Sequence, residues 1–186
     1  MSLKEFMKFT PTKIPDVILI EPTVFSDSRG FFFESYSKEI FSRNGISVEF
    51  VQDNHSSSAR GVLRGLHYQV RPKEQAKLVR VVSGAAFDVV VDIRRGSRTF
   101  GKFVAHQLTA ENKKMVYVPV GFAHGFYVLK DSTEFLYKVS SPYSPEHERG
   151  ILWNDPELGI PWPKLDVDYV ISEKDKRHPA LKNSGS

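Results

Sequence analysis

The residues Phe87-Asp-Val-Val-Val-Asp-Ile93 alternate in a regular way: the odd-numbered positions are apolar, and Asp88 and Asp92 share the opposite face. Side chains on a β-strand alternate with a period of two, so this pattern predicts a strand. Similar extended runs, separated by glycine and proline, lie on both sides of it at residues 17–20, 31–36, 77–82, 103–108, 115–118, 125–129 and 134–139. Strands with this spacing predict a sandwich or closed barrel, and we expect an all-β jelly roll whose mouth holds one ligand.

Few helices and a single domain are expected. Residues 37–44 fit a short helix, with Ser37 as the N-cap and Gly45 just past its end. A second turn begins at residues 172–175 and closes at Pro179. The length suits one domain, residues 1–186, in which residues 1–6 are a candidate N-terminal extension and residues 180–186 a flexible tail.

The composition argues against several classes of function. Hydrophobic residues make up 40% and charged residues 26% of the chain, which is typical of a soluble globular protein. The formal net charge of +4 suits an anionic small molecule, but no block of lysine and arginine predicts nucleic-acid binding. The absence of cysteine excludes disulfides and thiolate metal sites and fits a reducing cytoplasm, where we expect the protein to act. No apolar stretch reaches the length of a membrane span.

A second informative stretch is Gly61-Val-Leu-Arg-Gly-Leu-His-Tyr-Gln69, in which Arg64 and His67 sit three residues apart within an apolar run. In a regular strand they project to opposite faces, and one of those faces belongs to the core. A buried arginine needs an anion, and a buried histidine needs an orienting partner. The stretch therefore predicts a pocket that grips a phosphate and moves a proton.

Three residues are candidates for acid–base and electrostatic catalysis, each with a structural alternative. His67 is either a general base, since imidazole titrates near neutral pH, or a core histidine bonded to a backbone carbonyl. Tyr137 shares a strand face with Phe135 and Val139. It is either a general acid that reaches into a pocket or a core tyrosine. Lys77, at the start of a strand, is either a cation beside an oxyanion or a solvated strand-end lysine.

Two further side chains have equally simple structural explanations. Arg29, before Gly30, is either a phosphate clamp or part of an ordinary turn. Asp175 lies at capping-box spacing from Ser172, with aspartate in place of the usual glutamate, so its carboxylate fits a helix cap. The residues alone leave both choices open.

The segment Pro119-Val-Gly-Phe-Ala-His124 matches the second half of the metal-binding signature of cupins, a family of β-barrels. The first half requires two histidines that flank one residue and then a glutamate, whereas His67 is followed by Tyr68 and Gln69. A stable non-haem metal site needs at least a facial triad of ligands. The sequence therefore predicts a cupin-type double-stranded β-helix without a metal, in which His124 is a pocket residue or a turn histidine bonded to backbone.

Together these segments resemble the dTDP-4-dehydrorhamnose 3,5-epimerase family, the nucleotide-sugar epimerases of rhamnose biosynthesis. The resemblance runs from about Ile14 to Pro179. Each segment alone is a weak signal, whereas all of them in this order are specific. The segments are residues 25–34, 50–55, 62–69, 77–80, 121–126, 135–138, 143–145 and 151–155.

The resemblance implies a jelly-roll homodimer that uses no metal and no redox cofactor and binds a dTDP-4-keto-6-deoxy-hexose. By matching positions, it implies that His67 is the base and that Asp175 orients it. It also implies that Tyr137 is the acid on the opposite face of the sugar and that Lys77 steadies the enolate oxygen. The family's substrate contacts fall on Arg29, Glu34, Gln52, Asp53, Asn54, Arg64, His124, Tyr143, Glu148 and Lys174.

The implied reaction converts dTDP-4-dehydro-6-deoxy-D-glucose to dTDP-4-dehydro-L-rhamnose by removing and returning protons at C3 and C5. The C4 ketone acidifies both hydrogens, and one base and one acid on opposite faces of the ring are the minimum for inversion. Three alternatives stay open: an epimerase that inverts only C3 or only C5, a cupin dioxygenase or other metal enzyme, and a non-catalytic sugar-nucleotide-binding cupin.

Overall fold

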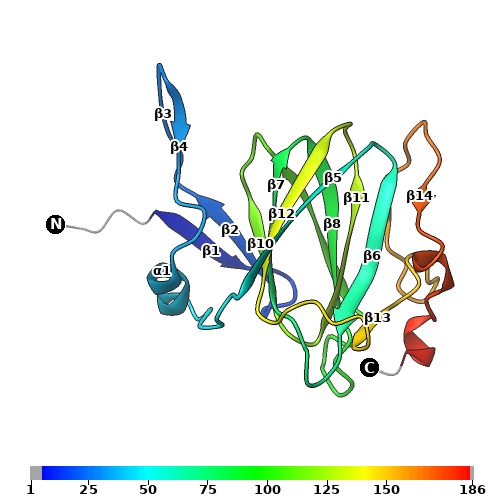
Figure 1. Cartoon of the computed structure of the whole chain (residues 1–186). Coiled ribbons are helices and arrows are strands. Elements are labelled where there is room, and N and C mark those ends of the chain that lie inside the picture. The colour runs from blue at the N-terminus through cyan, green and yellow to red at the C-terminus, as the bar shows by residue number, and fades with distance from the viewer. Residues whose placement is uncertain (1–5, 185–186) are drawn as a thin grey trace.

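The computed structural model describes residues 6–184 and is built mainly from two sheets that face each other (Figure 1). The first sheet runs in the order β1 (Met7–Pro11), β2 (Ile18–Pro22), β10 (Met115–Val118), β7 (Lys77–Ser83), β12 (Thr133–Val139) and β5 (Gln52–Ser58). The second runs in the order β13 (Glu148–Gly150), β6 (Val62–Gln69), β11 (Phe122–Val128), β8 (Ala85–Asp92) and β9 (Phe103–Thr109). These strands pair antiparallel, and β14 (Val170–Ile171) joins β6 in parallel. The expected all-β jelly roll is confirmed.

A hairpin and three short helices complete the described chain. Strands β3 (Phe25–Asp27) and β4 (Gly30–Phe32) form a hairpin that projects away from the two sheets in Figure 1. The expected strand at residues 31–36 is therefore too long. The helices are α1 (Lys38–Arg43), η1 (Asp175–Arg177) and η2 (Leu181–Asn183). Within residues 6–184, none is long and apolar enough to cross a bilayer.

The N-terminus of α1 follows from its sequence. Ser37 has an extended backbone, and its Oγ accepts a hydrogen bond from the backbone N–H of Ile40 at 3.4 Å. This bond satisfies one of the N–H groups that the first turn of a helix leaves free. The expected short helix and its cap are confirmed.

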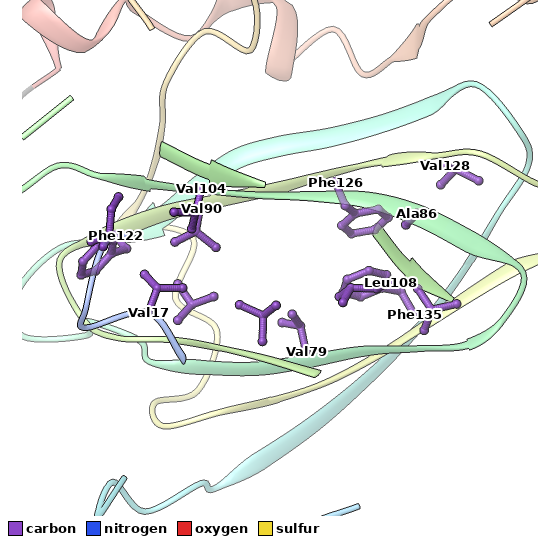
Figure 2. Close-up of a cluster of buried hydrophobic side chains, with 14 residues drawn as sticks. Val17, Val79, Ala86, Val90, Val104, Leu108, Phe122, Phe126, Val128 and Phe135 are labelled. Atoms are coloured by element: carbon purple, nitrogen blue, oxygen red, sulfur yellow. The ribbon is translucent and has the colours of Figure 1, made fainter. Parts of the chain in front are cut away.

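Apolar side chains fill the space between the two sheets (Figure 2). Val79 and Phe135 enter this core from the first sheet, and Val90 and Phe126 enter it from the second. The rings of Phe126 and Phe135 stack with their centroids 4.1 Å apart. Burial of branched and aromatic side chains is the main favourable term in folding, and here it fixes the two sheets relative to each other.

Strand β8 is covered on both faces. The odd-numbered apolar residues of the stretch at residues 87–93 pack beneath Leu158 and Trp162 of the C-terminal segment. The other face points between the sheets, where Asp88 and Asp92 are 1% and 0% exposed. Arg94 binds Asp92 at 2.7 Å, whereas Asp88 is bound by a histidine of the candidate site. The predicted alternation is confirmed, and the buried carboxylates each have a partner.

The C-terminal segment is more firmly held than its sequence predicts. Leu181 is 5% exposed, and its backbone N–H donates to Asp155 Oδ2 at 2.7 Å. A distant carboxylate thus supplies a partner that no local pattern reveals, and the flexible tail at residues 180–186 stays a prediction. Residues 185–186 of that tail, and residues 1–5 of the expected extension, lie outside the described residues. The single domain stays a prediction.

Candidate active site

A cavity of about 580 Å³ opens between the two sheets. The first sheet lines it with Lys77 from β7 and Tyr137 from β12. The second sheet lines it with His67 from β6 and His124 from β11, and Asp175 approaches from the C-terminal segment. A groove of about 390 Å³ adjoins the cavity and shares His67, Lys77 and Tyr137. The size and the few converging polar groups are typical of a small-molecule site.

His67 and Asp175 form a hydrogen-bonded pair, with His67 Nε2 2.8 Å from Asp175 Oδ1. The other carboxylate oxygen accepts a bond from the backbone N–H of Gly65 at 3.2 Å. Burial raises the pKa of Asp175, but the neighbouring imidazoles of His178 and His67 outweigh this effect and hold the pKa well below its usual range. An ionised carboxylate keeps a proton on Nε2 and leaves Nδ1 free to accept one. This is the arrangement of a general base with its orienting partner.

The two polar residues of β6 share one face, contrary to expectation. Opposite β11, His67 pairs with His124 and Arg64 pairs with Phe126, so three steps along β6 match two steps along β11. This bulge reverses the alternation of side chains, and both residues line the cavity. The prediction that one of the two is buried is wrong, because Arg64 is exposed and the side chain of His67 is 28% exposed. The bulge therefore turns an arginine and an imidazole toward the same cavity.

Lys77 is buried at the start of β7, at 9% exposed, so the alternative of a solvated strand-end lysine is wrong. Burial lowers its pKa to about 8, although the carboxylates of Glu148 and Asp88 act in the opposite direction. Its Nζ lies 3.4 Å from the backbone oxygen of His67. A cation in a dry cavity interacts strongly with negative charge that develops beside it.

Tyr137 enters the cavity from the sheet opposite His67. It follows the predicted strand face, on which Phe135 and Val139 are each 1% exposed. Burial raises the pKa of the Tyr137 phenol, while the Arg64 guanidinium lowers it and Glu148 raises it further. The phenol is therefore protonated at neutral pH and is able to donate a proton.

His124 is a cavity residue with a carboxylate partner, so the alternative of a turn histidine bonded to backbone is wrong. Its Nε2 lies 2.6 Å from Asp88 Oδ2, and both side chains are buried. The other oxygen of Asp88 is buried without a hydrogen-bond partner among residues 6–184. The strand pattern placed Asp88 on one face but predicted no role for it, although a carboxylate within a run of valines was a usable signal.

Comparison with known proteins identifies the family to which this chain belongs. A family model described as dTDP-4-dehydrorhamnose 3,5-epimerase matches residues 11–183. The chain belongs to this epimerase family. The dTDP-4-dehydrorhamnose 3,5-epimerase of Pseudomonas aeruginosa is 59% identical over 176 residues, which cover 94% of this chain and 96% of that protein. The expected family, and with it the isomerase class, is confirmed.

Solved structures of the epimerase family share the fold. The dTDP-6-deoxy-D-glucose-3,5-epimerase of Legionella pneumophila, in complex with dTDP-4-keto-L-rhamnose, superposes with a TM-score of 0.92 at 46% identity and covers 95% of this chain and 94% of its own. A 3'-monoepimerase from Streptomyces bikiniensis, in complex with dTDP-quinovose, superposes with a TM-score of 0.87 at 38% identity. The superposition covers 92% of this chain and 87% of the monoepimerase chain. The predicted cupin-type fold is confirmed.

Several of the predicted substrate-contact positions surround the cavity and its groove. Gln52 and Asn54 line the groove from alternate positions of β5, and Gln52 Nε2 donates to Asn54 Oδ1 at 2.8 Å. Arg64 lines the cavity, and its Nη2 donates to Ser58 Oγ at 3.1 Å. The structure therefore brings amide groups and a guanidinium to one opening.

Tyr143, Glu148 and Lys174 form a polar cluster beside this opening. The Tyr143 hydroxyl donates to Glu148 Oε2 at 2.6 Å, and the Lys174 ammonium binds the same oxygen. Burial raises the pKa of Glu148, but the hydrogen bonds from Lys174 and Tyr143 outweigh it and lower the pKa below its ordinary value. Glu148 is thus ionised, and it links β13 to the turn that carries Asp175.

Three predicted contact positions do not line the cavity of their own chain. Asp53 lies on the exposed face of β5, where it accepts a bond from Lys138 Nζ at 2.9 Å. Arg29 lies at the tip of the β3–β4 hairpin, 2.6 Å from Asp27. Glu34 lines a separate hollow beside β1 and α1. Contact of these residues with a ligand stays a prediction.

Proposed function

We propose that this member of the epimerase family inverts both C3 and C5 of dTDP-4-dehydro-6-deoxy-D-glucose and so produces dTDP-4-dehydro-L-rhamnose. The observation that supports the proposal best is that His67 and Tyr137 line one cavity from opposed sheets. Inversion of a carbon needs a proton to leave one face and another to arrive at the opposite face, and these two side chains match that need.

Proton removal falls to His67. Its Nδ1 takes the hydrogen from C3 or C5 as a proton, and the electron pair moves into the C4 carbonyl to give an enolate. Asp175, 2.8 Å from Nε2, stabilises the imidazolium that forms. The ammonium of Lys77 stabilises the enolate oxygen, an effect often worth about 3 kcal/mol in a dry site.

Proton return falls to Tyr137. Its phenol gives a proton to the opposite face of the same carbon, and the enolate collapses to the ketone. The phenolate left behind is favoured by the nearby Arg64 guanidinium, which lowers the pKa of Tyr137 against the larger effect of burial. Water in the cavity then carries a proton from the His67 imidazolium to the phenolate, and both side chains return to their starting states. The substrate is neither oxidised nor reduced overall, so we propose that the reaction needs no redox cofactor.

The diphosphate and the nucleotide supply binding energy away from the reacting carbons. Arg64 at the mouth of the cavity is a cation that can pair with phosphate oxygens. Remote binding of this kind positions the sugar ring and offsets the entropy of orienting it. We assign the remaining contacts to Gln52, Asn54, His124, Tyr143, Glu148 and Lys174, with Asp53 at the outer edge.

We propose that the protein is a homodimer in which the β3–β4 hairpin completes the partner's cavity. The hairpin carries Phe31 and Phe32, whose side chains are 63% and 66% exposed in a single chain. Apolar rings in that position are typical of a surface that packs against another copy. Seated on the partner, the hairpin would carry Arg29, and the segment that follows it would carry Glu34, toward the ligand. We place this dimer in the cytoplasm and assign it no membrane or nucleic-acid partner.

A deuterium experiment tests the proposal. The substrate is incubated with the protein in heavy water, and deuterium at C3 and C5 is located by NMR. Deuterium and inversion at both carbons support the proposal. Deuterium at one carbon supports a single-position epimerase, an alternative favoured by the likeness to a 3'-monoepimerase. Retention of both hydrogens supports a non-catalytic binding protein, and stoichiometric iron or manganese in the purified protein supports a metal enzyme.

A further inference from the structure

His178 extends the pair formed by His67 and Asp175. Its Nε2 lies 3.5 Å from Asp175 Oδ1, the oxygen that His67 Nε2 contacts at 2.8 Å. The longer contact is too long for a good hydrogen bond, and Nε2 of His178 is buried without a hydrogen-bond partner among the described residues. A buried nitrogen in that state costs free energy unless it has a ligand.

The position of His178 is set by the backbone around it. Its ring fills the space beside Gly150, where an added Cβ would lie 2.3 Å from Nε2. Gly150 pairs with His67 across β13 and β6, and the two imidazole rings meet edge to face with centroids 5.6 Å apart. The glycine therefore admits a second imidazole next to the first. No local pattern reveals this contact, because it depends on how the chain just after η1 packs against β13.

We propose that His67, Asp175 and His178 form a binding site for a divalent transition metal of the zinc class. Two imidazole nitrogens and one carboxylate oxygen are ligands that Zn²⁺ and Co²⁺ accept. The ligand atoms of the three residues all lie within 4.8 Å of one another. Two atoms bound at about 2.1 Å to a tetrahedral zinc lie about 3.4 Å apart. The contact of His178 with Asp175 is 3.5 Å, and the 2.8 Å contact of His67 with Asp175 would have to widen by about 0.6 Å to admit the ion.

The surroundings suit such an ion. Asp175 is ionised, and its negative charge compensates part of the charge of the metal. The second oxygen of this carboxylate is held by the backbone N–H of Gly65 at 3.2 Å, so the first oxygen keeps its orientation. His67 and Asp175 also line the cavity, so a water molecule from the cavity can supply the fourth ligand.

Occupancy of this site switches the catalytic base off, a consequence that rests on the proposed function. A metal on Nε2 of His67 uses the lone pair of that nitrogen. The single proton of the neutral ring then sits on Nδ1, which can no longer accept a proton from C3 or C5. The metal is thus a reversible inhibitor rather than a cofactor, and a chelator restores the base.

Metal binding is tested by titrating the chelator-treated, full-length protein with CoCl₂, followed by visible absorption and calorimetry. We expect one Co²⁺ per chain at a site that His178→Gln and His178→Leu each weaken by about tenfold or more. His55→Gln is the matched control, because it removes an exposed imidazole that lies 3.1 Å from Glu134 and should leave the titration unchanged. Circular dichroism verifies that the variants fold. Absence of Co²⁺ binding that depends on His178 overturns the proposal.

Inhibition is tested separately with ZnCl₂ in the epimerase assay. Zinc should inhibit the native chain, and EDTA should reverse the effect. Each variant is compared with itself without metal, and His178→Gln should need about tenfold more zinc for the same fractional inhibition. Co²⁺ binding through His178 without any inhibition would support the metal site and contradict the assignment of His67 as the base.

Discussion

His67 on β6 and Tyr137 on β12 line the same cavity from two different sheets. The jelly roll itself creates this opposition, because β6 and β12 lie in sheets whose inner faces look at each other (Figure 1). We expect a pyranose ring bound between them to turn one face toward the imidazole and the other toward the phenol. The same base and the same acid can therefore act at either of two ring carbons.

Replacement of His67 tests whether one base serves both carbons. His67→Ala should abolish deuterium exchange at C3 and at C5 together, and we expect kcat to fall by about 10²- to 10⁴-fold. The measurement is NMR of substrate recovered from heavy water. His55→Ala removes an exposed imidazole and should exchange normally. Substantial residual exchange at either carbon would contradict the role of His67.

Replacement of Tyr137 separates proton return from proton removal. Tyr137→Phe should retain some exchange but release less inverted product, because the enolate still forms and its donor on the second face is gone. The ratio of exchanged to inverted sugar, followed by NMR, is the measurement. Tyr117→Phe alters a partly buried phenol on β10 of the same sheet and should invert normally. An unchanged ratio in Tyr137→Phe would exclude this acid.

The pH dependence of activity should report Lys77. Its pKa is lowered to about 8, so kcat/KM should fall as the pH rises through that value and the ammonium is lost. Asp88 raises the pKa of Lys77, so Asp88→Asn should move the alkaline limb of the pH profile, where kcat/KM falls, to lower pH. Glu134→Gln, on the exposed side of β12, should leave the limb in place. A limb that moves upward in Asp88→Asn would refute the assignment.

Asp175 should make the stability of the fold depend on pH. Its pKa in the folded protein lies below its unfolded value, so the ionised form stabilises the fold above that value, about 3.9, and the contribution is lost as the pH falls. Asp175→Asn should therefore reduce the free energy of unfolding by about 2 kcal/mol at neutral pH. Urea unfolding at about pH 7 and at about pH 3 should show that the difference in unfolding free energy between the native chain and Asp175→Asn becomes smaller in acid. A constant gap would mean that the charge is not responsible.

A mixing experiment tests the exchanged hairpin. Chains with Arg29→Ala and chains with His67→Ala are combined, unfolded and refolded together. If the hairpin completes the partner's cavity, one of the two sites in each mixed dimer carries both lesions and the other carries none, so roughly a quarter of native activity should return. If Arg29 serves its own chain, every site keeps one lesion and activity stays low. Sedimentation of the mixture checks that dimers form.

Local alternation predicts most of the site but not its details. The run at residues 115–118 matches β10 residue by residue, and the face of Tyr137 is correct, because both depend only on the period of a strand. The family resemblance pointed to the pairing of His67 with Asp175, which lies 108 positions away, whereas spacing alone explained Asp175 only as a cap.

The errors arise where a strand depends on its neighbour. The shared face of Arg64 and His67 comes from a bulge that only the pairing of β6 with β11 reveals. Leu181 is held by Asp155, 26 positions away, and Arg29 lies on a hairpin that projects away from the two sheets (Figure 1). These contacts depend on long-range packing, which no local pattern carries.

Because of the extra residue in β6, the placement of Arg64 and His67 depends on the number of residues in that strand. Deletion of one amino acid between residues 62 and 69 would restore simple two-residue phasing, and the guanidinium and the imidazole would then diverge. Every chemical group needed for turnover would still be encoded, yet the chain would be inert. Substitution tables therefore underestimate how sensitive this segment is to the insertion or deletion of a residue. Engineering by loop or strand grafting should keep the number of residues in β6 unchanged.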